Sequence, residues 1–403
     1  KGVYQIPYRC YVTPDLDNLF VGGRIISSSH VANGTTRVMC TSALGGEVIG
    51  RAASICLSKG YKPIDLVDRD RIGLLQSLLV KNGNFIPGIA VAVEDNLADS
   101  AEISVSSVLE LDDLPADGTW FGLDYPIAQL IPVNGKVPVV RMNVKADNAT
   151  RLVMELRSSS KSENYTPDTI DAVLEFDLKK DENEIVADFS YSYATPRYAF
   201  ICLMKNPEIS VPMSGRLVTG LTAVYNYINP AVSNFGKQVP PEGIGVEEFE
   251  FWCPKRRPES KNIAMSFAPS LASFNSENLR NSYYRPYIGT NAWVAAFDDA
   301  RPEVCFKWNG RKQIKTIILY FDTDTDQAME TVQMGHFDAC VPTCYREYII
   351  RDSEGKELYH ITGNHQTLNV LELDQPVTTD AIYVNFVRPC GDVCPGLMGV
   401  YVC

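Results

Sequence analysis

Short runs of alternating apolar and polar residues, separated by turn residues, dominate the sequence from about residue 89 onward. Between residues 89 and 228 they read VPVVRMNVKA, RLVMELRS, AVLEFDL, EIVADFSYSY and RYAFICLM, and from 246 to 403 they read QIKTIILYFD, YREYIIRD, ELYHITG, TLNVLELD and AIYVNFVRP. Alternation with a period of two is the pattern of a half-buried strand, and several such strands at near-regular spacing are typical of a sandwich. The sequence therefore predicts a mainly β protein, with a β-sandwich over 89–228 and a second sandwich or jelly roll over 246–403.

Two further regions have different patterns. Residues 229–245, NPAVSNFGKQVPPEGIG, are rich in Pro, Gly and Asn and lack periodicity, so they predict a linker. Residues 1–88 contain DRDRIGLLQSLLVKNG, which has the apolar spacing of a helix. Asp68 is placed to cap the start of this helix, and Gly83 is placed to end it in a left-handed conformation.

The charge balance excludes some classes of partner. The chain has 403 residues, 45% of them hydrophobic, and a formal net charge of −12. A chain this acidic is not expected to bind nucleic acid or anionic lipid, and its one basic run, Lys255-Arg256-Arg257, reads as a solvated turn. No apolar run approaches the roughly 20 residues of a membrane-spanning helix. We therefore predict neither a nucleic-acid nor a membrane partner.

Eleven cysteines, an odd number, leave at least one unpaired within a monomer. Most lie in apolar runs and predict buried thiols. Cys340, Cys344, Cys390 and Cys394 are spaced as two CxxxC pairs, and the sequence leaves open a disulfide among them or a zinc site with His336. The acidic run DTDTD, residues 322–326, lacks the residues of an EF-hand loop, so we predict no calcium site there and assign no residue as a metal ligand.

A dense stretch near the start, residues 17–56, carries the strongest signal of a site. The apolar run Leu19–Val21 predicts a short strand that leads into Gly22, Gly23 and Arg24, and a polar loop then precedes the small-residue helix ALGGEVIGRAAS. Glycines let a backbone approach a flat ligand closely, and a helix N-terminus offers free N–H groups to an electron-rich edge. A plain strand, turn and helix packed together remains the alternative interpretation.

The run YQIPYRCYVTPDLDNLFVGGRIISSSHVANGTTRVM resembles the C-terminal signature of a family of FAD-dependent oxidoreductases. The matching elements are Ile-Pro-Tyr-Arg, Asn-Leu-x-Val-x-Gly-Arg, Ile-Ser-x-x-His and Arg-Val-Met, followed by a Gly/Ala-rich helix. The chain departs from the family at Glu47-Val48-Ile49. Segments such as RPYIGTNAWVA and MGHFDACVPTCYREYIIRDSEGKEL resemble the tail of longer members, which implies a discoidin, galactose-binding-like jelly roll after a small α/β remnant of an FAD-binding domain.

This resemblance implies a role for each residue of the stretch. Gly22, Gly23 and Arg24 would line the flavin, and Gly46 would lie at a helix N-terminus facing the flavin O2/N1 edge. His30 would transfer a proton, because an unperturbed imidazole titrates near neutrality, and Arg37 would orient a substrate or pair with an acid such as Asp17.

The 403 residues contain no GxGxxG, the motif with which such enzymes bind the ADP half of FAD. We therefore expect the chain to start where the second half of a flavoprotein starts. Its partner would be the missing N-terminal half, FAD would be bound only in the complete protein, and this chain alone would be inactive. The substrate is open and includes carbohydrate-related molecules.

An aromatic cluster in the last region suggests a glycan ligand. Tyr284, Arg285 and Trp293, with Tyr283 and Tyr287 beside them, concentrate faces on which sugar rings stack. Packing at the ends of a jelly roll is the alternative reading of this cluster. The rival function for the whole chain is accordingly a non-catalytic carbohydrate-binding or structural β protein. The compartment is not determined, and a periplasmic or secreted location stays open.

Overall fold

The computed structural model describes residues 4–89, 95–160, 167–227, 236–238, 249–255, 260–323 and 343–403. The chain divides into two compact units, Val3–Asn96 and Leu97–Cys403. Strands account for 44% of the structure and helices for 18%, which confirms the mainly β class with a small helical N-terminal region. No helix in the described ranges is long and apolar enough to cross a bilayer.

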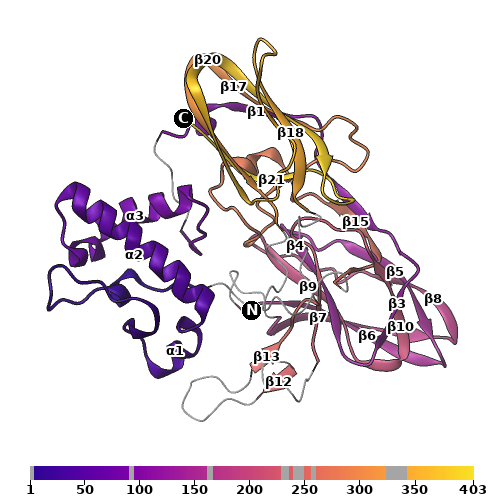
Figure 1. Cartoon of the computed structure of the whole chain (residues 1–403). Helices are drawn as coiled ribbons and strands as arrows, with labels where there is room; N and C mark the ends of the chain where they lie inside the picture. The colour runs from indigo at the N-terminus through magenta and orange to yellow at the C-terminus, as the bar shows by residue number, and fades with distance from the viewer. Residues whose placement is uncertain are drawn as a thin grey trace. The chain divides into compact units, whose positions relative to one another are not determined.

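The described part of the N-terminal unit contains three α-helices with short 3₁₀ turns between them (Figure 1). The helices are α1 (His30–Thr36), α2 (Met39–Lys59) and α3 (Arg69–Lys81), and the turns include η1 (Tyr8–Tyr11), η2 (Gly23–Ile25) and η3 (Pro63–Val67). The predicted caps of α3 are confirmed: the Asp68 carboxylate accepts from the Asp70 and Arg71 amides, and Gly83 has φ 87°. Its core is formed by Tyr8, Tyr11, Val12, Ile26, Ala52, Cys56, Leu66, Leu75 and Leu79.

The strand predicted at Leu19–Val21 is wrong. Within the described part of this unit, the segment makes one isolated bridge, between Val12 and Phe20. A strand needs a neighbour along its whole length to satisfy its backbone groups, and η1 and the loop after it supply only that single pairing.

Two antiparallel sheets form the sandwich. One has the order β14-β10-β5-β15-β2, with β3 on β10 and β8 on β5, and the other has the order β11-β4-β9-β6-β7. The first contains β2 (Leu111–Leu114), β3 (Trp120–Leu123), β5 (Val139–Ala146), β8 (Asp181–Ala187), β10 (Asn206–Ser214), β14 (Asn262–Ile263) and β15 (Met265–Leu271). The second contains β4 (Ile127–Val133), β6 (Thr150–Ser158), β7 (Thr169–Leu178), β9 (Arg197–Leu203) and β11 (Ala223–Tyr225).

Polar and aromatic contacts join the two sheets. The amide of Gln129, fully buried on β4, donates to Asn262 Oδ1 (3.0 Å) and accepts from the Ile263 backbone N–H (2.8 Å), both on β14. Phe121 of β3 lies edge-on to Tyr225 of β11, with ring centroids 5.3 Å apart. Because Gln129 is satisfied at both ends of its amide, its burial carries little cost.

A third sheet contains most of the C-terminal strands, drawn in orange and yellow in Figure 1, in the order β16-β21-β17-β20-β18-β19. These are β16 (Trp293–Val294), β17 (Glu303–Phe321), β18 (Tyr345–Asp352), β19 (Glu357–Ile361), β20 (Leu368–Pro389) and β21 (Gly396–Val402). The runs TLNVLELD and AIYVNFVRP, which read as two strands, lie in the single long strand β20. Neighbours that are not consecutive in the chain, such as β21 between β16 and β17, are expected of a jelly roll.

The two β regions exchange strands. β1 (Glu102–Val105) pairs with β17, and β14 and β15 pair with β10, β5 and β2. The boundaries 89–228, 229–245 and 246–403 stay a prediction. Within the predicted linker, β12 (Gly236–Gln238) pairs with β13 (Phe249–Phe251), and the other linker residues lie outside the described ranges.

Candidate functional site

Gly22 and Gly23 of the N-terminal motif are glycines for two different structural reasons. A Cβ on Gly22 would lie 2.9 Å from Cδ1 of Ile49 in α2, so this glycine allows the loop to contact the helix closely. Gly23 has φ 64°, a left-handed conformation that disfavours other residues, and a Cβ there would meet nothing within 4 Å. The space above Gly23 is therefore open to a ligand. Arg24 follows in η2 with its side chain exposed.

His30 and Arg37 lie at opposite ends of α1. His30 is the first residue of the helix and is exposed, while Ser29 Oγ caps the helix by accepting from the Ala32 amide. Arg37 is the C-cap residue and is also exposed, and its side chain has no ion pair within the described residues. The alternative pairing of Arg37 with Asp17 is wrong, because Asp17 instead pairs with Lys62 at 2.7 Å.

The helix that carries Gly46 begins earlier than predicted. It starts at Met39, after Val38, so Gly46 lies well inside α2 and not at its N-terminus. The free N–H groups and the positive dipole end are therefore at Met39, and the dipole argument does not apply to Gly46. A Cβ on Gly46 or Gly50 would meet nothing within 4 Å, so one turn of the helix surface is open at its backbone.

The acidic departure from the family pattern, Glu47, is engaged inside the unit. Its carboxylate pairs with Arg51 at 2.7 Å and accepts from the Asn84 side-chain amide at 3.1 Å. Glu47 is thereby held against α2 and the segment after α3.

Large apolar side chains are exposed around the same motif, a feature that the sequence analysis missed. The exposed fraction is 73% for Ile25, 70% for Val31 and 86% for Met39, and Val38 and Leu44 are more than half exposed. Single exposed apolar residues are ordinary, but five between positions 25 and 44 are a concentration typical of an interaction surface.

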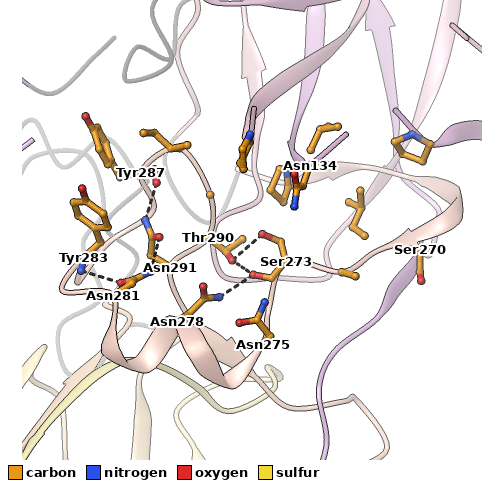
Figure 2. Close-up of a pocket in the computed structure, with 18 of the residues that line it drawn as sticks. Asn134, Ser270, Ser273, Asn275, Asn278, Asn281, Tyr283, Tyr287, Thr290 and Asn291 are labelled. Carbon is orange, nitrogen blue, oxygen red and sulfur yellow. Dashed lines mark hydrogen bonds between the residues drawn. The ribbon is translucent and has the colours of Figure 1, made fainter. Parts of the chain in front are cut away.

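The β-rich unit contains a cavity of about 520 Å³. Its wall is built from the connection between β4 and β5, the end of β15 with the segment after it, η5 (Ser276–Arg280) and the loop 281–291. In Figure 2, Asn134 faces Ser273 and Thr290 across the cavity, with Tyr283 and Tyr287 toward one end and Ser270 toward the other.

Asparagine amides fix the shape of the loop 281–291. Asn281 donates to Asn291 Oδ1 (2.8 Å) and accepts from the Tyr283 backbone amide (2.9 Å). Asn291 donates to the carbonyls of Tyr287 (2.7 Å) and Arg285 (3.0 Å). These amides replace the regular backbone pairing that the loop lacks.

Some residues of the aromatic cluster are buried in the core, and others line the cavity. Trp293 is fully buried, and its indole N–H donates to the Ser107 carbonyl at 2.9 Å, so the predicted stacking of a sugar on Trp293 does not fit the structure. Tyr284 stacks on Tyr320 with ring centroids 3.6 Å apart, and burial raises its pKa to about 12. Arg285 is half-buried. Of this cluster, Tyr283 and Tyr287 line the cavity.

The cysteines favour a disulfide over zinc. Cys390 is disulfide-bonded, as expected of one of the four candidates, while Cys344 and Cys394 are free and Cys340 and His336 lie outside the described residues. Burial raises the pKa of both free thiols to about 12. The described residues contain no group of three metal-binding side chains.

Comparison with known proteins supports the reading of the first segment. Residues 1–79 match the family model of FAD dependent oxidoreductases. This match coincides with the segment that carries Gly23, His30, Arg37 and Gly46. A search of curated proteins finds no match to the chain.

Among solved structures, the chain is similar to carbohydrate-binding modules over about a third of its length. A family 32 module of Streptococcus pneumoniae EndoD has 12% identity over 32% of this chain and 86% of the module, with a TM-score of 0.25. A family 32 module of C. perfringens NanJ, solved with galactose, has 10% identity over 32% and 85%, with a TM-score of 0.24. A chitosan-binding module of a Paenibacillus chitosanase/glucanase has 12% identity over 33% and 86%, with a TM-score of 0.25.

Proposed function

We propose that this chain is the C-terminal part of a flavin (FAD)-dependent oxidoreductase. The observation that carries the proposal is the family match over residues 1–79, which falls on a motif whose backbone is open at Gly23 and Gly46. These openings fit a planar ring that contacts the chain closely. A GxGxxG segment, which the 403 residues lack, would hold the ADP half of FAD from another part of the complete protein.

Each residue of the motif then has a role. Gly22, Gly23 and Arg24 line the ring, and Gly46 contributes open helix surface. FAD supplies the hydride acceptor of an oxidation when it is bound. His30 is the candidate for moving a proton at the substrate, and Arg37, whose guanidinium is not engaged by a described carboxylate, is the candidate for orienting the substrate.

The exposed apolar residues of the motif support a partner surface. Ile25, Val31 and Met39 expose most of their side chains, and covering them would stabilise an assembly with the GxGxxG half. The chain alone would lack both that cover and the ADP-binding contacts, and we propose that it is inactive by itself.

Flavin absorbance tests this proposal. The chain alone is expected to be colourless, and co-expression with a GxGxxG half should yield a yellow complex that absorbs at about 450 nm. Gly23→Trp should abolish FAD binding by occupying the open space, whereas Gly73→Trp in α3, also open at its Cβ position, should retain it. His30→Ala should retain FAD and lower turnover. Stoichiometric FAD on the chain alone, or FAD retained by Gly23→Trp, would contradict the proposal.

A second candidate function, carbohydrate binding, is favoured by the cavity of the β-rich unit. Its wall combines asparagine and serine side chains with the ring of Tyr283, whereas Tyr284 and Trp293 are committed to packing. Binding of simple sugars to the chain, measured by saturation-transfer NMR, tests this candidate. A carbohydrate-related substrate for the oxidoreductase would be consistent with it.

An extracytoplasmic location stays a prediction. The disulfide at Cys390 favours an oxidising compartment, since stable disulfides are rare in the cytosol. Thiol trapping in intact cells, followed by fractionation, would test the location directly.

A further inference from the structure

Four polar side chains on the cavity wall have no partner within the described part of the chain. The side chains of Asn134, Lys136, Ser270 and Asn275 line the cavity and make no hydrogen bond or ion pair with any described residue. They differ from Asn281 and Asn291, whose amides hold the loop, as Figure 2 shows. The wall thus contains polar groups that build it and polar groups that remain available to a ligand.

The backbone of the wall is fixed in an unusual conformation. Ser282, Ile288 and Asn291 all have positive φ, at 62°, 63° and 51°. For the β-branched Ile288 this conformation is strongly disfavoured. The hydrogen bonds of Asn281 and Asn291 hold the loop in it, and strain of this kind concentrates at ligand-binding sites, where it pre-organises the wall.

The chemistry of the wall selects among ligands. Among the described residues that line the cavity, Lys136 has the one charged side chain, and none has a carboxylate. A phosphate-bearing ligand needs several cationic or backbone N–H donors, which this wall does not concentrate. Amides and hydroxyls both donate and accept, as sugar hydroxyls do.

Apolar surface alternates with these polar groups. Pro132, Pro138, Pro196 and Pro269 line the cavity, and Tyr283 adds an aromatic ring. Such surfaces suit the C–H faces of a sugar ring, and the volume of about 520 Å³ lies within the usual range for small-molecule sites.

We infer that this cavity is a binding site for an uncharged saccharide, whose hydroxyls are recognised by Asn134, Ser270 and Asn275 while Tyr283 contacts the ring. The inference rests on the second candidate function above and assigns it to one place in the fold. It is independent of the flavin proposal, because every residue that it uses lies in the unit Leu97–Cys403.

Saturation-transfer NMR on the full chain tests the assignment, with galactose, N-acetylglucosamine, cellobiose and galacturonate as probes. At least one neutral probe should bind, and Asn134→Ala and Asn275→Ala should each weaken its binding about three- to tenfold by removing one hydrogen bond. Asn309→Ala is the matched control, since this exposed asparagine of β17 lies outside the cavity wall and has no described partner. Ser270→Trp should reduce binding further by filling the cavity.

The possible outcomes distinguish a failure of the proposed site from a failure of carbohydrate binding by the chain. Neutral-sugar binding that is weakened by the cavity variants but not by Asn309→Ala supports the site. Equal binding by the wild type and all variants overturns the site, and the carbohydrate would then bind elsewhere on the unit. Binding of galacturonate alone, abolished by Lys136→Ala, overturns the neutral assignment. No binding of any probe to a folded sample overturns both the site and the second candidate function.

Discussion

Replacing Gly399 by alanine should destabilise the β-rich unit through one ring. The ring of Tyr284 covers Gly399 of β21 and stacks, with an interplanar angle of 7°, on the ring of Tyr320, the register partner of Gly399 on β17. A Cβ at position 399 would contact Cε1 of Tyr284 and lie 2.6 Å from its Cδ1 and 3.4 Å from Cδ2 of Tyr320. The Tyr284 ring would have to move, and Tyr320, which is fully buried and stacked on its face, restricts that movement.

Two effects determine how much stability the Gly399→Ala variant should lose. Overpacking a well-packed site typically costs about 1–3 kcal/mol, and the stacked ring pair contributes about 0.5–1.5 kcal/mol beyond its buried area. We therefore expect Gly399→Ala to lower the free energy of unfolding by about 2–4 kcal/mol. Gly363→Ala is the control, because a Cβ there meets nothing within 4 Å at an ordinary φ.

Urea unfolding followed by tryptophan fluorescence measures this effect. The chain has four tryptophans, Trp120, Trp252, Trp293 and Trp308, and all lie in Leu97–Cys403, so the signal reports that unit alone. In a Tyr284→Ala background, Gly399→Ala should cost almost nothing, since the clashing ring is gone. An equal cost in both backgrounds would refute the reasoning.

Three further predictions concern the cysteines, acid stability and the tryptophan core. Thiol titration of the unfolded, non-reduced chain should find nine free thiols, because nine cysteines are unpaired, and three or fewer would indicate a disulfide framework. Burial favours a higher pKa for Asp117, but hydrogen bonds from Lys261 and Thr119 outweigh it and leave the pKa lowered. The stability that ionised Asp117 contributes is then fully present above its unfolded pKa of about 3.9 and is lost at lower pH. In urea unfolding, Asp117→Asn should therefore lose less stability than the wild type when the pH falls below about 4. The same loss of stability in both proteins would contradict this. Trp293→Ala should cost about 3–5 kcal/mol of stability by emptying a buried site, and a stable, fully folded variant would contradict the core assignment.

Local patterns predicted the regular elements well. Period-two alternation identified β5 to β9 and β17 to β20 but not strands such as β4 and β10. The helix α3 was predicted with its caps because Asp68 and Gly83 act on their own backbone neighbourhood. The start of α2 was misplaced because its N-cap residue, Val38, makes no side-chain cap hydrogen bond, so no signal marks the boundary.

The candidate sites were less predictable, because they depend on residues far apart in the chain. Trp293 is buried by contacts with Ser107 and Phe386, and an aromatic cluster read along the sequence does not separate core from surface. The cavity joins Asn134, between β4 and β5, to Asn275, after β15. No spacing within either segment signals the other.

The exchange of strands between the β regions limits where related genes could recombine. A crossover between β10 and β14 would separate β1 from β17 and would also separate β14 and β15 from β10, β5 and β2. Each separation leaves rows of backbone N–H and C=O groups at open sheet edges, which favours aggregation over folding. A junction near Leu97, between the two compact units, cuts no strand pairing among the described residues. The β-rich unit is therefore expected to be inherited and transferred whole.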